Sequence, residues 1–179
     1  MEFSKLIEER RSMRAYKAAE PITDGEIESM IYAAQQAPSW KNSQTGRYYA
    51  VSSKDALENF RSKCLPGFNF ERTENALAFI VTSFKAGISG FAPDGTQTDG
   101  NGNGWGCYDL GLQNSLLLLK AKELGYDTLV MGLRKEAVIR EMLGIPEDEK
   151  IVSVIAVGKG AVRADKPERQ EIGSILKIF

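Results

Sequence analysis

Apolar and polar positions alternate with two different periods along the chain, and these periods predict a succession of helices and strands. The clearest helical stripe covers residues 23–37, where Thr23 and Glu26 have the spacing of a capping box and Pro38 favours an end to the helix. The apolar residues of this stripe recur at the i, i+3, i+4 and i+7 positions that face a core: Ile27, Met30, Ile31 and Ala34.

The rest of the chain repeats such patterns in shorter pieces. Further helices are expected over residues 2–10, 55–65, 108–125 and 135–144, and strands over 47–53, 76–84, 127–133 and 151–158. Helices and strands alternate, but two helices also follow each other at the start. This order favours an α+β fold built as a three-layer α-β-α sandwich over a doubly wound parallel sheet. No repeat or change of composition divides the sequence, so residues 1–179 are expected to form a single domain.

One long segment lacks any such period. Residues 87–106 are rich in glycine and aspartate, and loops of this length are uncommon in compact domains unless they are functional or mobile. A calcium loop is disfavoured, because Trp105 stands where an EF-hand needs glutamate. We expect a flexible glycine-rich insertion, which either forms a movable roof over a site or is a surface loop without a role.

Composition narrows the classes of function. The chain carries 23 Lys and Arg, 24 Asp and Glu and no histidine, for a formal net charge of −1. A net acidic chain has no general attraction for nucleic acid, and no apolar run is long enough to predict a membrane span. Without imidazole, Ser–His and Cys–His pairs are excluded, and any demanding chemistry is expected to come from a bound cofactor. With no export signal, Cys64 and Cys107 are expected to be reduced thiols in a cytoplasmic protein.

The stretch ERRSMR, residues 9–14, concentrates positive charge near the start of the chain. In an extended segment, Arg10, Ser12 and Arg14 alternate and therefore point to the same side. Two guanidinium groups and one hydroxyl suit a phosphate, which accepts several charge-assisted hydrogen bonds. The alternative interpretation is a solvated helix end, where cations are also favoured.

The next polar segment, APSWKNSQ at residues 37–44, changes the balance between these interpretations. R-x-S-x-R, followed about 25 residues later by P-S-x-x-N-x-Q, resembles the FMN-dependent nitroreductase family. The strand region GYDTLVMGL and the cationic KPER after the last strand extend the resemblance, in order, over nearly the whole chain. It implies an α+β sandwich with a central, mostly antiparallel sheet, assembled as an intertwined homodimer with FMN at the interface.

The resemblance also implies a set of cofactor-binding residues. Phosphate and ribityl contacts would come from Arg10, Arg11, Ser12 and Arg14, with phosphate cations at Lys166 and Arg169. The stretch that reaches the flavin from the partner subunit would be Pro38, Ser39, Trp40, Asn42 and Gln44. Asn69 and Arg72 would line the polar edge of the ring, and the backbone of Met131 and Gly132 would face flavin N5.

The implied activity is a ping-pong reaction. NAD(P)H would pass hydride to flavin N5, and a nitroaromatic, a quinone or a related small acceptor would then take the electrons, with no catalytic side chain and no metal. The family usually has Pro-Trp after the glutamine, whereas Thr45 and Gly46 stand here, and Trp40 replaces a small residue. These departures affect the expected choice of substrate. Alternatives are another flavin reaction, such as dehalogenation or dehydrogenation, or an FMN-binding protein without catalysis.

Overall fold

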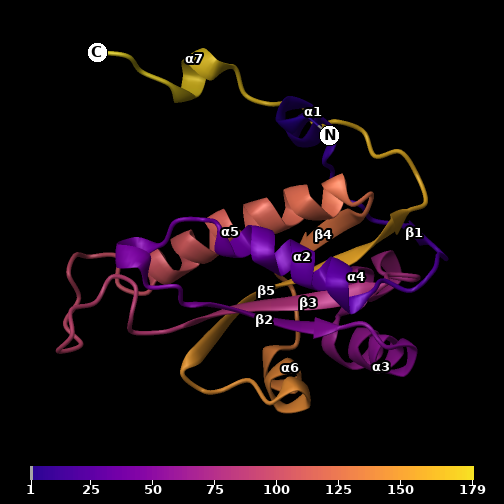
Figure 1. Cartoon of the computed structure of the whole chain (residues 1–179), viewed down its shortest axis with the longest axis horizontal. Coiled ribbons are helices and arrows are strands. Elements are labelled where there is room, and N and C mark those ends of the chain that lie inside the picture. The colour runs from indigo at the N-terminus through magenta and orange to yellow at the C-terminus, as the bar shows by residue number, and fades with distance from the viewer. Residues whose placement is uncertain (1) are drawn as a thin grey trace.

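A single five-stranded sheet forms the centre of the computed structural model, which describes residues 2–179 (Figure 1). The strands are β1 (Tyr16–Lys17), β2 (Gly46–Val51), β3 (Ala78–Lys85), β4 (Asp127–Met131) and β5 (Glu149–Gly160). The long β5 pairs with β3 on one side and with β4 and β1 on the other, while β2 pairs with β3 at the far edge. Every one of these pairings is antiparallel, so the expected mostly antiparallel sheet is confirmed.

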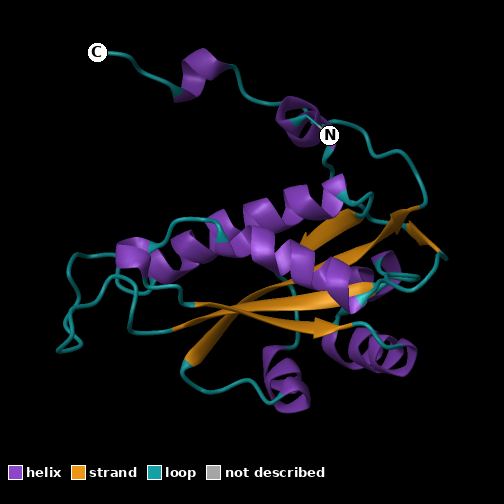
Figure 2. Cartoon of the chain, in the orientation of Figure 1, coloured by secondary structure: helices purple, strands orange, loops and turns teal. Residues whose placement is uncertain are grey.

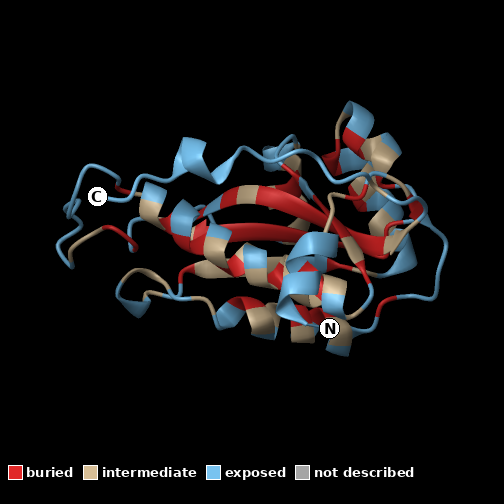
Figure 3. Cartoon of the chain, turned by 90° about the horizontal axis from the view of Figure 1, so that it is seen from above, coloured by how far each residue is buried: buried red, intermediate tan, exposed pale blue. Residues whose placement is uncertain are grey.

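Helices cover both faces of this sheet, as Figure 2 shows. One layer contains α2 (Asp24–Gln35) and α5 (Gly104–Glu123), and the other contains α3 (Lys54–Cys64) and α6 (Glu136–Leu143). The sheet is therefore buried on both sides, which is plain in the view from above in Figure 3. Neighbouring residues of β3 point to opposite faces, so Ile80 packs in the core under α2 and α5 while Phe79 packs in the core under α3 and α6. The predicted three-layer sandwich is confirmed.

Local sequence signals explain several element ends. The Thr23 hydroxyl accepts from the Glu26 amide at 3.2 Å, and the Glu26 carboxylate accepts from the Thr23 amide at 2.9 Å, so the capping box of α2 is present. Gly125 and Gly144 follow α5 and α6 with φ of 80° and 63°, conformations that glycine adopts at little cost.

Other boundaries differ from the sequence prediction. The helix expected from residue 108 begins at Gly104, so the glycine-rich loop ends at Asn103 rather than at residue 106. The first turn of α5 packs closely on the sheet: a Cβ on Gly106 would lie 2.3 Å from the Phe84 ring, so glycine lets α5 approach β3 here. The short elements β1 and α4 (Gly67–Arg72) were not predicted, because neither is long enough to show a period.

Both ends of the chain lie outside the sandwich (Figure 1). The short helix α1 (Phe3–Glu9) precedes the arginine stretch, and the C-terminal residues run through the single turn α7 (Ile172–Ile175) away from the sheet. Large apolar side chains of this tail are exposed: Ile172, Ile175, Leu176, Ile178 and Phe179. Over residues 2–179, no helix combines the length and the apolarity that crossing a membrane requires.

Candidate functional site

Arginines from the two ends of the chain converge on one pocket of about 370 Å³. The pocket, called the anion pocket below, is lined by Arg10, Arg11, Ser12, Arg14, Arg163, Ala164, Asp165, Pro167 and Arg169. Two contacts hold the first stretch against the sheet: Ser12 forms a parallel bridge with Thr128 of β4, and the Met13 amide donates to the Thr128 carbonyl at 2.8 Å. Arg10, Ser12 and Arg14 line the same pocket, and so does Arg11, which strict alternation would direct to the other side.

Positive charge dominates the anion pocket, whose lining contains five arginines and one carboxylate, that of Asp165. Among the ion pairs of residues 2–179, none within 4.0 Å involves Arg10, Arg11, Arg14, Arg163 or Arg169. Their guanidinium hydrogen bonds, where present, go to backbone carbonyls, as from Arg14 to Ser12 and from Arg169 to Pro167. Partial burial and then the charges of Arg11 and Arg169 lower the pKa of Arg10 from its ordinary value, although an arginine remains protonated near neutral pH. The arrangement is complementary to a multiply charged anion.

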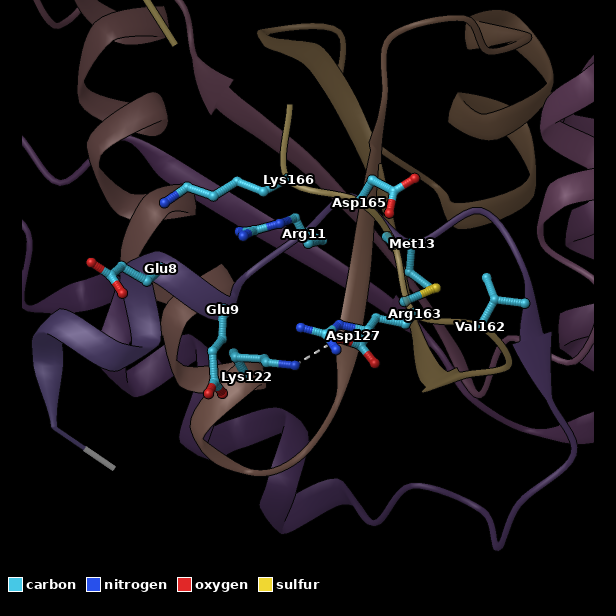
Figure 4. A pocket seen from close by; sticks show the side chains of 11 residues that line it. Glu8, Glu9, Arg11, Met13, Lys122, Asp127, Val162, Arg163, Asp165 and Lys166 are labelled. Carbon is cyan, nitrogen blue, oxygen red and sulfur yellow. Dashed lines mark hydrogen bonds and ion pairs between the residues drawn. The ribbon is translucent and has the colours of Figure 1, made fainter. Parts of the chain in front are cut away.

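A second pocket of about 750 Å³ adjoins the anion pocket and shares Arg11, Arg163 and Asp165 with it (Figure 4). Its wall carries both signs of charge: the side chains of Glu8, Glu9 and Asp127 face those of Lys122 and Lys166. Lys122 donates to Asp127 at 3.1 Å. Lys166, which the resemblance assigns to the phosphate, therefore lines this neighbouring pocket and not the anion pocket.

The carboxyl end of β4 meets the short helix α4. The Asn69 amide is buried and donates to the Leu133 carbonyl at 2.9 Å, so Asn69 fixes the chain directly after Met131 and Gly132. Arg72 at the end of α4 lies over the Phe68 ring, 4.5 Å from its centroid. Because Thr128 and Met131 are three residues apart in one strand, this strand end lies about 10 Å along β4 from the point where Ser12 joins the sheet.

A third group of expected residues lies in a strained turn between α2 and β2. Lys41, Asn42 and Gln44 have φ of 46°, 55° and 49°, a left-handed conformation that costs non-glycine residues about 1–2 kcal/mol each. Hydrogen bonds hold the turn: the Gln44 amide donates to the Ser39 hydroxyl at 3.1 Å, and the Gln44 side chain donates to Asn42 at 3.2 Å. Pro38, Asn42 and Gln44 are exposed, whereas Ser39 and Trp40 are half-buried.

This turn and the anion pocket lie near opposite ends of α5. The Trp40 amide donates to Asp109 in the second turn of the helix, and Lys122 in its last turn lines the pocket beside the anion pocket. Along the helix axis these two residues are about 20 Å apart. In one chain, then, the structure brings the arginine stretch together with Arg169, and Asn69 together with the strand end, while residues 38–44 lie near the opposite end of α5 from the arginine stretch.

Two residues of this region were missed by the sequence analysis. Arg163 lines the anion pocket, and the only signal for it was a basic residue soon after the last strand. Asp109 is buried under the strained turn, and nothing in its local sequence distinguishes it from a solvated acid on a helix.

Comparison with known proteins finds a family and relatives that match most of the sequence. The profile described as the Nitroreductase family matches residues 7–159. A protein of Archaeoglobus fulgidus named as a candidate NADH dehydrogenase/NAD(P)H nitroreductase is 32% identical over 159 residues, which cover 86% of this chain and 83% of that protein.

Solved structures share the fold over the full length. A candidate nitroreductase of Exiguobacterium sibiricum in complex with FMN has a TM-score of 0.86 at 22% identity and covers 100% of this chain and 98% of its own. A candidate NAD(P)H:FMN oxidoreductase of Staphylococcus epidermidis has a TM-score of 0.83 at 21% identity, covering 99% and 96% respectively. At such identities the likeness establishes the fold alone.

Proposed function

The chain belongs to the nitroreductase family, and from that membership we propose that it is an FMN-dependent oxidoreductase that uses NAD(P)H to reduce small acceptors such as nitroaromatics and quinones. The observation that carries this proposal is the anion pocket, where five arginines from the two ends of the chain meet without a carboxylate partner. Such a pocket fits a terminal phosphate, which a mononucleotide has and a free flavin lacks.

The donor set fits FMN along its length. Arg10, Arg14 and Arg169 would hold the phosphate by charge-assisted hydrogen bonds, and the Ser12 hydroxyl is available to the adjoining polyol chain. The end of β4 lies about 10 Å further along the strand, where the exposed backbone of Gly132 would face the ring. When bound, the flavin supplies the hydride-transfer chemistry that amino-acid side chains do not provide.

We also propose that two copies of the chain are needed to complete the site. The exposed side chains of Asn42 and Gln44 belong to a turn held at Asp109, and about 20 Å of helix separates Asp109 from Lys122 beside the anion pocket, so the turn and the anion pocket lie near opposite ends of α5. A second copy would supply Asn42 and Gln44, in agreement with the large apolar residues that the C-terminal tail exposes.

Two measurements test the proposal. The flavin released by heating the purified protein should be FMN, because five arginines suit the doubly charged terminal phosphate of FMN better than the singly charged diester phosphates of FAD. Anaerobic titration with NADH or NADPH should bleach the flavin absorbance, and addition of a quinone should restore it. Release of FAD, or failure to bind FMN on reconstitution, contradicts the proposal, and bound FMN that neither nucleotide bleaches indicates a binding protein without catalysis.

A further inference from the structure

A buried carboxylate links three segments at the start of α5. Asp109 is only 2% exposed, and both of its carboxylate oxygens accept from the Trp40 amide, at 3.1 and 3.0 Å. The Ser89 hydroxyl, itself 1% exposed, donates to the same carboxylate at 2.7 Å. Because that proton is committed to Asp109, the Ser43 hydroxyl donates in turn to Ser89, at 2.6 Å.

This network surrounds the strained turn from both sides. Trp40 precedes the three left-handed residues Lys41, Asn42 and Gln44, and Ser43 lies among them. The other backbone hydrogen bonds of residues 39–44 join residues of the turn to one another, and Arg47 of β2 donates to the Gln44 carbonyl at 3.0 Å. Asp109 and Ser89 are therefore the residues that connect the turn to α5 and to the glycine-rich loop. Figure 1 shows the turn after α2 beside the start of α5, with the 87–103 loop next to both.

Burial of the Asp109 carboxylate costs solvation free energy, and packing of the core does not require a charged group at this position. A buried carboxylate is expensive unless its partners compensate it, and within residues 2–179 Asp109 has neutral donors and no cation within 4.0 Å. The donors that it satisfies belong to two other segments and not to its own helix. Its position is therefore explained by what it holds in place.

We propose that Asp109 is a positioning residue of the site: through the Trp40 amide and the Ser89–Ser43 hydroxyl pair, it holds the 39–44 turn, with its left-handed residues, in the conformation that presents Asn42 and Gln44 outward. This inference rests on the proposed function, in which those side chains meet the flavin bound mainly by a second copy. Since Ser89 belongs to the glycine-rich loop, the same network fixes one end of that loop to the turn.

The direct test is the order of the turn, measured without activity. Trypsin cleaves after Lys41, which is exposed and held in the turn. In the full-length protein with saturating FMN, Asp109→Ala should raise the initial rate of cleavage after Lys41 about tenfold or more, because two buried donors lose their acceptor. Asp109→Asn keeps one acceptor oxygen and should fall between Asp109→Ala and the unchanged protein, and Ser89→Ala should also raise the rate.

A control separates local release from general destabilisation. Leu117→Val removes a methylene group from a fully buried side chain two turns further along α5 without touching the network. It should lower the melting temperature but should not favour Lys41 over the other tryptic sites, which mass spectrometry of the first products can establish. If Asp109→Ala fails to fold, Asp109→Asn and Ser89→Ala carry the test.

The second readout concerns the site itself. Asp109→Asn should reduce kcat/KM for a quinone about tenfold and alter the absorbance spectrum of the bound flavin, while changing the FMN dissociation constant less than about threefold. The phosphate cations remain intact in this variant. Unchanged cleavage after Lys41 in every Asp109 and Ser89 variant overturns the inference. If the unchanged protein does not bind FMN, the proposed function fails, whereas the cleavage result still decides whether Asp109 holds the turn.

Discussion

The anion pocket and the 39–44 turn are built in opposite ways, although both are assigned to one ligand. The anion pocket collects five like charges near the surface, with side chains that bond little except backbone carbonyls. The turn is held by one buried carboxylate and a pair of hydroxyls, and its own backbone is strained. Charge is thus distributed over several replaceable residues in the first region, while conformation depends on very few residues in the second.

This difference determines how each region should respond to change. Electrostatic attraction acts over several ångströms and tolerates imperfect geometry, so losing one arginine weakens the pocket in proportion. A strained turn has an alternative conformation of lower backbone energy, so loss of its few anchoring bonds should release it as a unit.

The largest effect is expected from removing several cations of the anion pocket together. Arg10→Ala, Arg14→Ala and Arg169→Ala combined should weaken FMN binding about a thousandfold, since charged hydrogen bonds contribute about 1.5 kcal/mol or more each. Arg14→Ala alone should cost about tenfold. Fluorescence titration of FMN measures both, and Lys54→Ala, Lys63→Ala and Lys150→Ala combined, which change the net charge equally at exposed positions, should leave the dissociation constant unaltered. If the arginine and lysine triple variants lose FMN affinity equally, the arginines of the anion pocket have no specific role in binding FMN.

Stability should respond strongly at Gly106, in the first turn of α5. Gly106→Ala places a Cβ 2.3 Å from the Phe84 ring, and overpacking of this kind costs about 1–3 kcal/mol. A melting temperature about 2–4 °C lower for each kcal/mol is expected for a chain of this size. The matched variant is Gly111→Ala in the same helix, where no atom lies within 4 Å of the new Cβ. Its higher helix propensity should stabilise the protein by about 0.5–1 kcal/mol, and calorimetry showing the same sign for both variants would contradict packing as the cause.

The two regions also differ in how far the sequence alone revealed them. The arginine stretch was predictable because alternation along an extended chain is a local property, and the helices and strands followed from periods within single segments. Arg163, the meeting of Asp109 with Trp40, and the start of α5 at Gly104 were not predictable, because each depends on a contact between residues distant in the sequence. Local patterns predicted the elements and the charge, whereas the buried network needed the assembled fold.

Salt offers a way to separate the two regions without mutation. Raising the ionic strength from about 0.1 M to about 1 M shortens the Debye length from about 10 to about 3 Å. FMN binding through the exposed and half-buried arginines of the anion pocket should weaken on the order of tenfold, because its largest attraction is screened. Cleavage after Lys41, corrected for the effect of salt on trypsin with a small peptide substrate, should change little, because the Asp109 bonds are buried. Parallel responses of the two quantities would mean that the turn, too, is held by exposed charge.

The smallest effect is expected at Trp40, where backbone and side chain have separable roles. Trp40→Ala removes the indole, over which Lys41 lies at 4.5 Å, but keeps the amide that donates to Asp109. The turn should therefore remain ordered, with unchanged cleavage after Lys41. An indole beside the ligand can stack on an aromatic acceptor, and such contacts contribute about 0.5–1.5 kcal/mol.

For Trp40→Ala we accordingly expect kcat/KM for a nitroaromatic or a quinone to change about two- to tenfold. The FMN dissociation constant should stay unchanged, because it depends on the arginines of the anion pocket. Steady-state kinetics with an aromatic and a non-aromatic acceptor measures this, and the non-aromatic acceptor is the internal control. Asp109→Asn should affect both acceptors, since it disturbs the whole turn, whereas Trp40→Ala should affect mainly the aromatic one. If both variants alter both acceptors alike, the indole acts through the conformation of the turn and not by contact with the substrate.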